Sequence, residues 1–324
     1  MLRSRNHLKT NTMAHLRKPD RSSSRLHNAV ADDLKVSRNG LLQFAELPRW
    51  LQDNVYLRTA YRPPSGSFWI SAKSAFMLHN ETVNIQSHLI GAIVFLILTQ
   101  CPYPPGLPVP PFPLLTSPLN QRALFPFYTG AVTCLTLSAS YHATNNVSPE
   151  IARKGNQADY LGILALIIGS FSSSIYFGFH CHPNLQKTYW IMIGSIGAAC
   201  AVVTVNPKFR TPEWRPWRAA MFIAMGLSAI IPVLHGLRIY GINGMEDRIG
   251  LWWLIAQGVT YVVGATIYAM RIPEKWYPGT FDLFGASHQI FHIFVLIAAG
   301  LHLVGLLRAA EHMAGEGAIC EDII

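Results

Sequence analysis

Charged residues are scarce in this sequence. Asp, Glu, Lys and Arg make up 13% of its 324 residues, whereas hydrophobic residues make up 50%. The charged share is about half of that usual for soluble globular domains. The length would allow two soluble domains or one domain that crosses a membrane several times. The composition favours the membrane domain.

Cysteine pairs with metal-binding spacing are absent. The five cysteines form no CxxC pair, and their number is odd. We therefore predict neither a thiolate zinc site nor a framework of disulfides. Histidine clusters of the HxxHH type, which a membrane di-iron site needs, are also missing.

A cleaved signal peptide is not expected, because no apolar core follows the first basic residues. Instead, the first 84 residues contain 13 of the 26 Lys and Arg residues. We predict a disordered basic cytosolic tail over residues 1–39. Residues 40–84 are expected to form an amphipathic interfacial segment, with a short helix over Leu41–Tyr56 broken near Pro48. Such a tail beside a membrane indicates anionic lipid, and not nucleic acid, as its neighbour.

Seven apolar runs have a length that spans or nearly spans a membrane. They cover Ile85–Cys101, Ala123–Tyr141, Tyr160–Phe179, Trp190–Val205, Ala219–Leu237, Leu251–Met270 and His288–Leu307. We predict an all-α membrane protein. Its seven-helix transmembrane bundle covers residues 85–308, and a short non-cytosolic tail follows over residues 309–324.

The distribution of basic residues predicts the orientation of the bundle. If the N-terminus is cytosolic, the cytosolic loops beyond residue 84 contain eight Lys and Arg residues, against five on the opposite side. Cytosolic loops carry the excess of positive charge. We therefore predict a cytosolic N-terminus and a C-terminus on the opposite side, in the plasma membrane or an internal membrane.

Polar side chains gather at the predicted cytosolic ends of several spans. His288 and His292 open the seventh span four residues apart, which places both on one helix face. Ser138 and His142 have the same spacing at the end of the second span, and Asp159 stands at the start of the third. Imidazole within a membrane helix is costly and rare, so these residues are candidates for a functional site.

The chemistry of these groups suits zinc. We predict that His142, His288 and His292 bind Zn²⁺, which leaves a fourth tetrahedral position for water. Asp159 is the candidate general base for that water, and Ser138 is the candidate hydrogen-bond partner of the water or of a substrate. Two histidines on one helix face cannot bind opposite faces of a haem, and zinc needs no redox partner.

Several of these residues have a plainer alternative role. Asp159 could cap the third helix, or it could bind the metal directly and so close the site. Ser138 could hydrogen-bond to its own helix. His88 could brace the bundle or touch the metal, while Glu81 and Asn84 could simply cap the first helix.

The polar residues belong to longer motifs, which include LPRWLQDN (47–54), YRPP (61–64), LHNETVNIQSHLIG (78–91), SASYH (138–142), DYLGI (159–163) and RIPEKWYPGTFDLFGASHQIFH (271–292). In order and spacing these motifs resemble the progestin and adipoQ receptor family. That family includes the adiponectin receptors, haemolysin-III-like proteins and fungal zinc-homeostasis membrane proteins. Gln86 and Ser87 replace the Trp-Thr usual in the receptor branch, and we expect a fungal zinc-homeostasis-type member.

The resemblance implies zinc on His142, His288 and His292, with Ser138 and Asp159 in the site, and it links the chain to membrane hydrolases such as alkaline ceramidases. Two classes of function follow. The first is an intramembrane zinc amidohydrolase acting on a ceramide-like or other lipid amide. The second is a receptor for an extracellular ligand, or a regulator of zinc, sterol or lipid homeostasis, whose zinc is structural.

Overall fold

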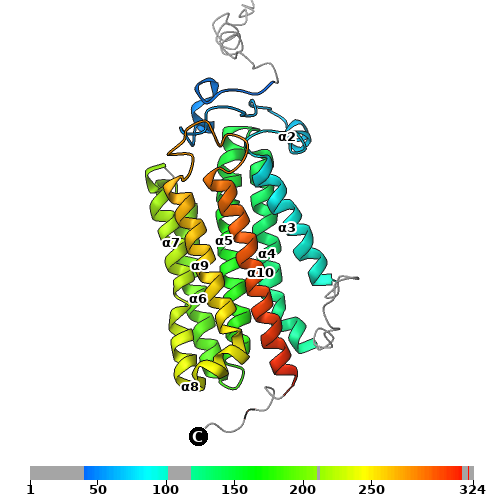
Figure 1. The fold of residues 1–324 in the computed structure, drawn as a ribbon, viewed down its shortest axis with the longest axis vertical. Coiled ribbons are helices and arrows are strands. Elements are labelled where there is room, and N and C mark those ends of the chain that lie inside the picture. Colours follow the sequence, from blue (N-terminus) through cyan, green and yellow to red (C-terminus); the bar gives the residue numbers. More distant parts are fainter. Residues whose placement is uncertain (1–39, 101–117, 210–211, 316–319, 321–324) are drawn as a thin grey trace, which may run out of the picture.

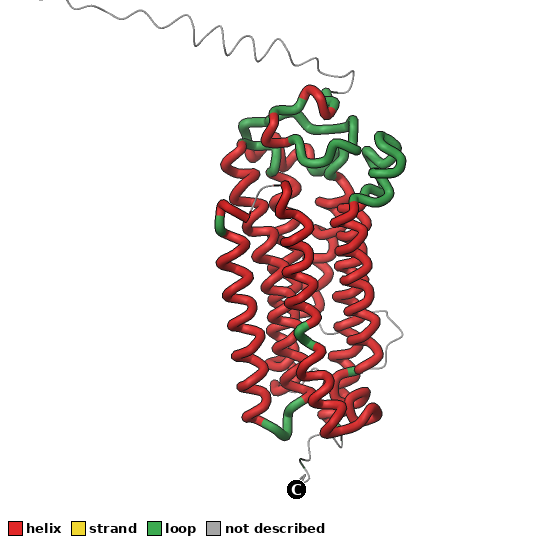
Figure 2. The backbone as a smooth tube through the Cα atoms, turned by 90° about the vertical axis from the view of Figure 1, so that its left-hand side faces the viewer, coloured by secondary structure: helices red, strands yellow, loops and turns green. Residues whose placement is uncertain are grey.

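The computed structural model describes residues 40–100, 118–209, 212–315 and residue 320. The predicted basic tail of residues 1–39 lies outside the described residues. The helices run side by side along the long axis of the molecule, and the loops around α2 gather at one end of the bundle (Figures 1 and 2). Helix α10 ends at the other end of the bundle.

Seven segments of the described chain are long and apolar enough to cross a membrane. Their helices are α3 (Thr82–Gln100), α4 (Pro118–Thr144), α5 (Pro149–Gly178), α6 (Pro183–Val205), α7 (Arg215–Leu227) with α8 (Ile230–Ile249), α9 (Leu251–Met270) and α10 (Ser287–Ala314). The described residues contain no strand, only an isolated bridge between Leu42 and Tyr61. The prediction of an all-α membrane protein with seven spans is therefore confirmed.

Helix α5 begins earlier than the sequence predicted. Ser148 caps its start by accepting a hydrogen bond from the backbone N–H of Ile151, and Pro149 occupies the first turn. The apolar run marks only the part of the helix inside the membrane, so it hides this extension. Asp159 consequently lies well inside α5, and the alternative that it caps the third helix is wrong.

The prediction of an amphipathic helix over Leu41–Tyr56 is wrong, although the predicted break near Pro48 is present. That stretch contains two short 3-10 helices, Phe44–Glu46 and Arg49–Leu51, on either side of Pro48. A proline has no N–H to donate and so interrupts a helix. The helix of this region is α2 (Phe68–Ser74), whose N-cap is Ser67.

The N-terminal segment is hydrogen-bonded to the loop between α9 and α10. Asn54 donates to Glu274 Oε1 at 3.1 Å, and both the backbone N–H of Arg58 and the hydroxyl of Thr59 donate to Asp282, at 2.9 and 2.6 Å. The fully buried Glu274 also accepts from the backbone and hydroxyl of Ser287, the first residue of α10. These bonds fix the start of α10, where the two predicted metal ligands stand.

Glycines allow α4 and α5 to approach closely. A Cβ atom on Gly162 of α5 would lie 2.9 Å from the Cα of Cys134 in α4, and one on Gly130 of α4 would lie 3.1 Å from the Cα of Leu166. Small residues at membrane helix interfaces permit such backbone contact. The close packing places the end of α4, with Ser138 and His142, beside Asp159.

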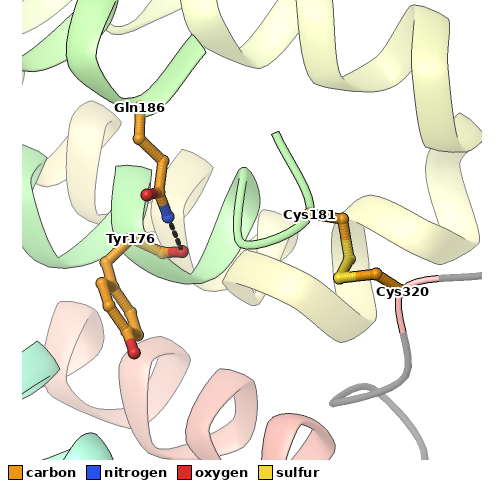
Figure 3. Close-up of a disulfide and its surroundings, with 4 residues drawn as sticks. All are labelled: Tyr176, Cys181, Gln186 and Cys320. Atoms are coloured by element: carbon orange, nitrogen blue, oxygen red, sulfur yellow. Dashed lines mark hydrogen bonds between the residues drawn. A yellow bond between two sulfur atoms is a disulfide. The ribbon is translucent and has the colours of Figure 1, made fainter. Parts of the chain in front are cut away.

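The structure contains one disulfide, for which the cysteine spacing gave no support. Cys181, in the turn between α5 and α6, is bonded to Cys320, which follows α10 (Figure 3). The side chain of Gln186 braces the same turn by donating to the carbonyl of Tyr176 at 2.9 Å. The two cysteines are 139 residues apart, so no local spacing could have indicated the pair. Cys134 and Cys200 are free and buried.

Candidate metal centre

Three imidazoles converge at the end of the bundle where α10 begins. His142 comes from the last turn of α4, and His288 and His292 come from the first turns of α10. One ring nitrogen of each lies within 4.8 Å of the others, and each pair of ring centroids is 4.9 Å apart. The structure thus brings the three predicted ligands together. Among the described residues no other His, Cys, Asp or Glu joins this group.

Helix α3 and the residue before it orient two of these imidazoles. The carboxylate of Glu81 lies 2.8 Å from His142 Nδ1, and the carbonyl oxygen of Asn84 lies 3.1 Å from His292 Nδ1. When both Nδ1 atoms donate these hydrogen bonds, the Nε2 atom of each ring carries a lone pair that can bind a metal ion. The Nε2 of His142 is buried and has no hydrogen-bond partner. Metal-binding histidines almost always donate their other N–H to a carboxylate or carbonyl, so this donor set fits a metal ion.

Glu81 is itself held by two amides. Its carboxylate accepts from the side chains of Asn84 at 2.6 Å and Asn145 at 3.0 Å. Burial alone would raise the pKa of Glu81, but the adjacent His142 and Asn84 outweigh burial and hold that pKa below its usual value. The carboxylate therefore stays ionised at neutral pH and accepts the His142 proton as a charged partner, which strengthens the bond.

Arg62 closes the end of α4. Its buried guanidinium donates to the carbonyls of His142 at 2.5 Å and Ala143 at 2.9 Å, and to the side chain of Asn145 at 2.9 Å. Burial lowers its pKa to about 10, against the opposing effect of Glu81, so it remains charged at neutral pH. A cation at a helix C-terminus satisfies the last carbonyls and the helix dipole.

The roles of Glu81 and Arg62 were missed in the sequence. The sequence places Glu81 at the start of the first span with capping as its plainer alternative role, and it presents Arg62 only within the YRPP motif. Their partners on α4 lie 61 and 80 residues away, so no helical spacing connects them. The one available signal was that both are charged residues within motifs next to an apolar span.

Asp159 and Ser138 lie beside the histidines. They line one small cavity of about 80 Å³ together with His288 and His292, and the Ser138 hydroxyl is hydrogen-bonded to Asp159. Asp159 is buried yet stands outside the group of mutually close ligand atoms. This position suits a base next to a metal better than a fourth protein ligand.

His88 braces one of the three histidines. Its ring is stacked on that of His292, with centroids 3.7 Å apart and planes inclined by 8°. It lines the small cavity but does not join the ligand group. Of the two alternatives for His88, the geometry supports bracing.

A much larger apolar cavity of about 590 Å³ adjoins this site. It extends among α5, α7, α8, α9 and α10. It shares wall residues with the small cavity: Cys134, Ile163, Phe222, Ala265, Phe291 and Val295. An apolar cavity thus lies next to the cavity that contains the polar groups around the histidines.

Comparison with known proteins identifies the family of the chain. The family model described as haemolysin-III related matches residues 76–303. The chain is 42% identical to the ADIPOR-like receptor IZH2 of Saccharomyces cerevisiae, covering 87% of each chain. It is 39% identical to the adiponectin receptor protein of Drosophila melanogaster over 83% of this chain, although only 59% of that receptor's length is covered. It is also 34% identical to heptahelical transmembrane protein 3 of Arabidopsis thaliana, over 82% of this chain and 86% of the relative.

The matched region contains Glu81, the three histidines, Asp159 and six of the seven spans in full. Of the spans, only α10 extends beyond it, by its last turns. The chain is therefore an integral, multi-pass membrane protein that belongs to the haemolysin-III-related family, together with proteins named as adiponectin receptors and ADIPOR-like receptors.

Proposed function

We propose that this protein is an intramembrane zinc amidohydrolase that cleaves a lipid amide of the ceramide type. One observation carries the proposal: three histidines with the geometry of metal ligands stand beside a buried Asp159–Ser138 pair, next to a large apolar cavity. His142, His288 and His292 would hold the ion. A bound zinc supplies a Lewis acid that polarises the amide carbonyl and makes water a nucleophile near neutral pH.

The residues of the chain supply the proton transfers. Asp159 takes a proton from the attacking water as the oxygen bonds to the carbonyl carbon. It then delivers that proton to the amide nitrogen as the C–N bond breaks, so that a fatty acid and an amine leave. Ser138 holds the Asp159 carboxylate in position by its hydrogen bond. Positioned acid–base groups of this kind contribute about 10²–10⁴-fold to a rate.

The apolar cavity supports a lipid as the substrate. Its volume of about 590 Å³ falls within the range of small-molecule sites, and its walls are mainly hydrophobic. An acyl chain in this cavity would place its amide at the shared wall, next to Asp159. The same walls keep bulk water away from the reacting groups.

The test is hydrolysis by purified protein in lipid nanodiscs, with zinc measured by elemental analysis and a short-chain ceramide followed by mass spectrometry. Asp159→Asn should retain zinc and lose about 10²–10⁴-fold in hydrolysis. Asp53→Asn is the matched control, because Asp53 is largely exposed, lies beside Arg271 and does not line the small cavity. If the wild-type protein contains zinc but does not hydrolyse lipid amides, the proposal that it is an amidohydrolase is contradicted.

A receptor or regulator with a structural metal is the second candidate, and it is favoured by the receptor names of the relatives. In that case the ion would only join α4 to α10 through His142 and the two histidines of α10. Asp159→Asn would then leave signalling intact, whereas His142→Ala would lower the melting temperature and abolish signalling. If Asp159→Asn abolishes the function of the protein in cells, the enzyme is supported. If only His142→Ala abolishes it, the receptor or regulator is supported.

A further inference from the structure

The segment Phe68–Leu78 comes shortly before α3. In contrast to a soluble protein, it buries small side chains and exposes large apolar ones. Its buried residues are the small Ser71 and Ala75. Six of its exposed residues are large and apolar, with 53% to 81% of each accessible: Phe68, Trp69, Ile70, Phe76, Met77 and Leu78. A contiguous apolar patch on the outside of a protein marks a surface that is covered by an apolar partner.

Hydrogen bonds hold this segment with its apolar side outward. The Ser71 hydroxyl donates to Asn146 at 2.8 Å, Arg62 donates to the Ser74 hydroxyl at 2.9 Å, and Gln86 donates to the carbonyl of Ala75 at 2.8 Å. These partners lie in the segment before α2, in α3 and just after α4. The buried side is therefore occupied by polar contacts, and the apolar side cannot rotate into the bundle without breaking them.

The patch is continuous with the surface that faces lipid. Helix α2 lies beside the upper end of α3 (Figure 1). Only seven residues separate Ser74, the last residue of α2, from Thr82, the first of α3. The apolar side chains of α3 that point outward are 47% to 58% exposed: Ile90, Ile93, Val94, Leu96 and Ile97. Since α3 is one of the seven spans, these side chains lie against the bilayer, and the patch extends that surface towards the end of the bundle.

The chemistry of the patch matches the headgroup region. Trp69 is the residue type enriched at the boundary between acyl chains and headgroups. Lys73 lies with its Nζ 4.9 Å from the centre of the Trp69 ring. A lysine so placed can bury its stem and present its charge to anionic headgroups.

We propose that Phe68–Leu78 is a lipid-docking segment, inserted at the headgroup–acyl boundary of the leaflet on the side of the metal centre. The bilayer itself is the partner. Because Arg62 joins Ser74 of this segment to the carbonyl of His142, the docked segment and the metal centre share one hydrogen-bonded support. The docking stands independently of the proposed amidohydrolase activity.

The test is site-directed spin labelling of the full chain in nanodiscs of phosphatidylcholine and phosphatidylserine. All free cysteines are replaced by alanine, and the Cys181–Cys320 bond is retained. Labels are placed by Trp69→Cys and Met77→Cys, with Ile93→Cys as the lipid-facing reference and Asp53→Cys as the aqueous reference. We expect labels at 69 and 77 to be relaxed strongly by oxygen and weakly by a water-soluble nickel complex, as at 93.

Two results would overturn the proposal. Nickel accessibility at 69 and 77 equal to that at 53 would place the segment in water. Low accessibility to both reagents, together with cross-linking between two copies through these positions, would identify a second copy as the partner. The label at 77 lies outside α2, so it still decides the matter if Trp69→Cys does not fold.

Discussion

At the scale of single residues, Glu81 is the group whose removal tests the metal centre most cleanly. It accepts a hydrogen bond from His142 and is not itself among the grouped ligand atoms. Glu81→Gln keeps the size but removes the charge, so His142 loses its ionised acceptor. We expect zinc affinity to fall about 10–100-fold, as measured by competition with a chelating dye. Glu46→Gln, at a half-buried acid whose carboxylate accepts from the backbone of Gln43 in its own turn, is the control. Unchanged affinity in the Glu81 variant would show that Glu81 does not support the ligand.

At the scale of helices, the α4–α5 contact decides whether His142 reaches the site. In Gly162→Ala the new methyl group would meet the backbone of Cys134, so α4 must shift away from α5. Overpacking of this kind costs about 1–3 kcal/mol, and we expect a lower melting temperature together with weaker zinc binding. Gly194→Ala is the matched control, because nothing lies within 4 Å of that position in α6. Equal melting temperatures for the two variants would refute the tight contact.

At the scale of the whole molecule, the disulfide bears on orientation. Cys181 follows α5 and Cys320 follows α10, whereas the three histidines lie in the last turn of α4 and the first turns of α10. The disulfide (Figure 3) is therefore at the end of the bundle opposite the histidines. Disulfides persist in oxidising compartments, and the basic residues predict that this end faces away from the cytosol. We expect reduction to expose two further thiols to a mass-tagging maleimide in protein from cells, and Cys320→Ser to abolish that increase. Cys200→Ser, at a buried free cysteine, should leave the increase unchanged. Equal tagging with and without reduction would place this end in a reducing compartment.

Local properties of the chain could be predicted from the sequence alone. A span needs an apolar run of membrane length, and all seven were found, although α5 extends beyond its run because its first turns are polar. The pair His288 and His292 follows from helical spacing within one element. His142 is linked to that pair by the order of the spans, because their alternation places the end of its helix at the same depth.

Only the tertiary structure decides which distant elements come into contact. Glu81 meets His142 across 61 residues, Glu274 meets Asn54 across 220, and Cys181 meets Cys320 across 139. The tertiary structure also decides that the apolar side chains around α2 point outward, since this depends on hydrogen bonds to α3 and to the residues just after α4. Hydrophobic length and helical period are carried by neighbouring residues, so the sequence determined the spans and the histidine pair. Partners in hydrogen bonds and disulfides are chosen by packing between helices, so they exist only once the bundle has closed.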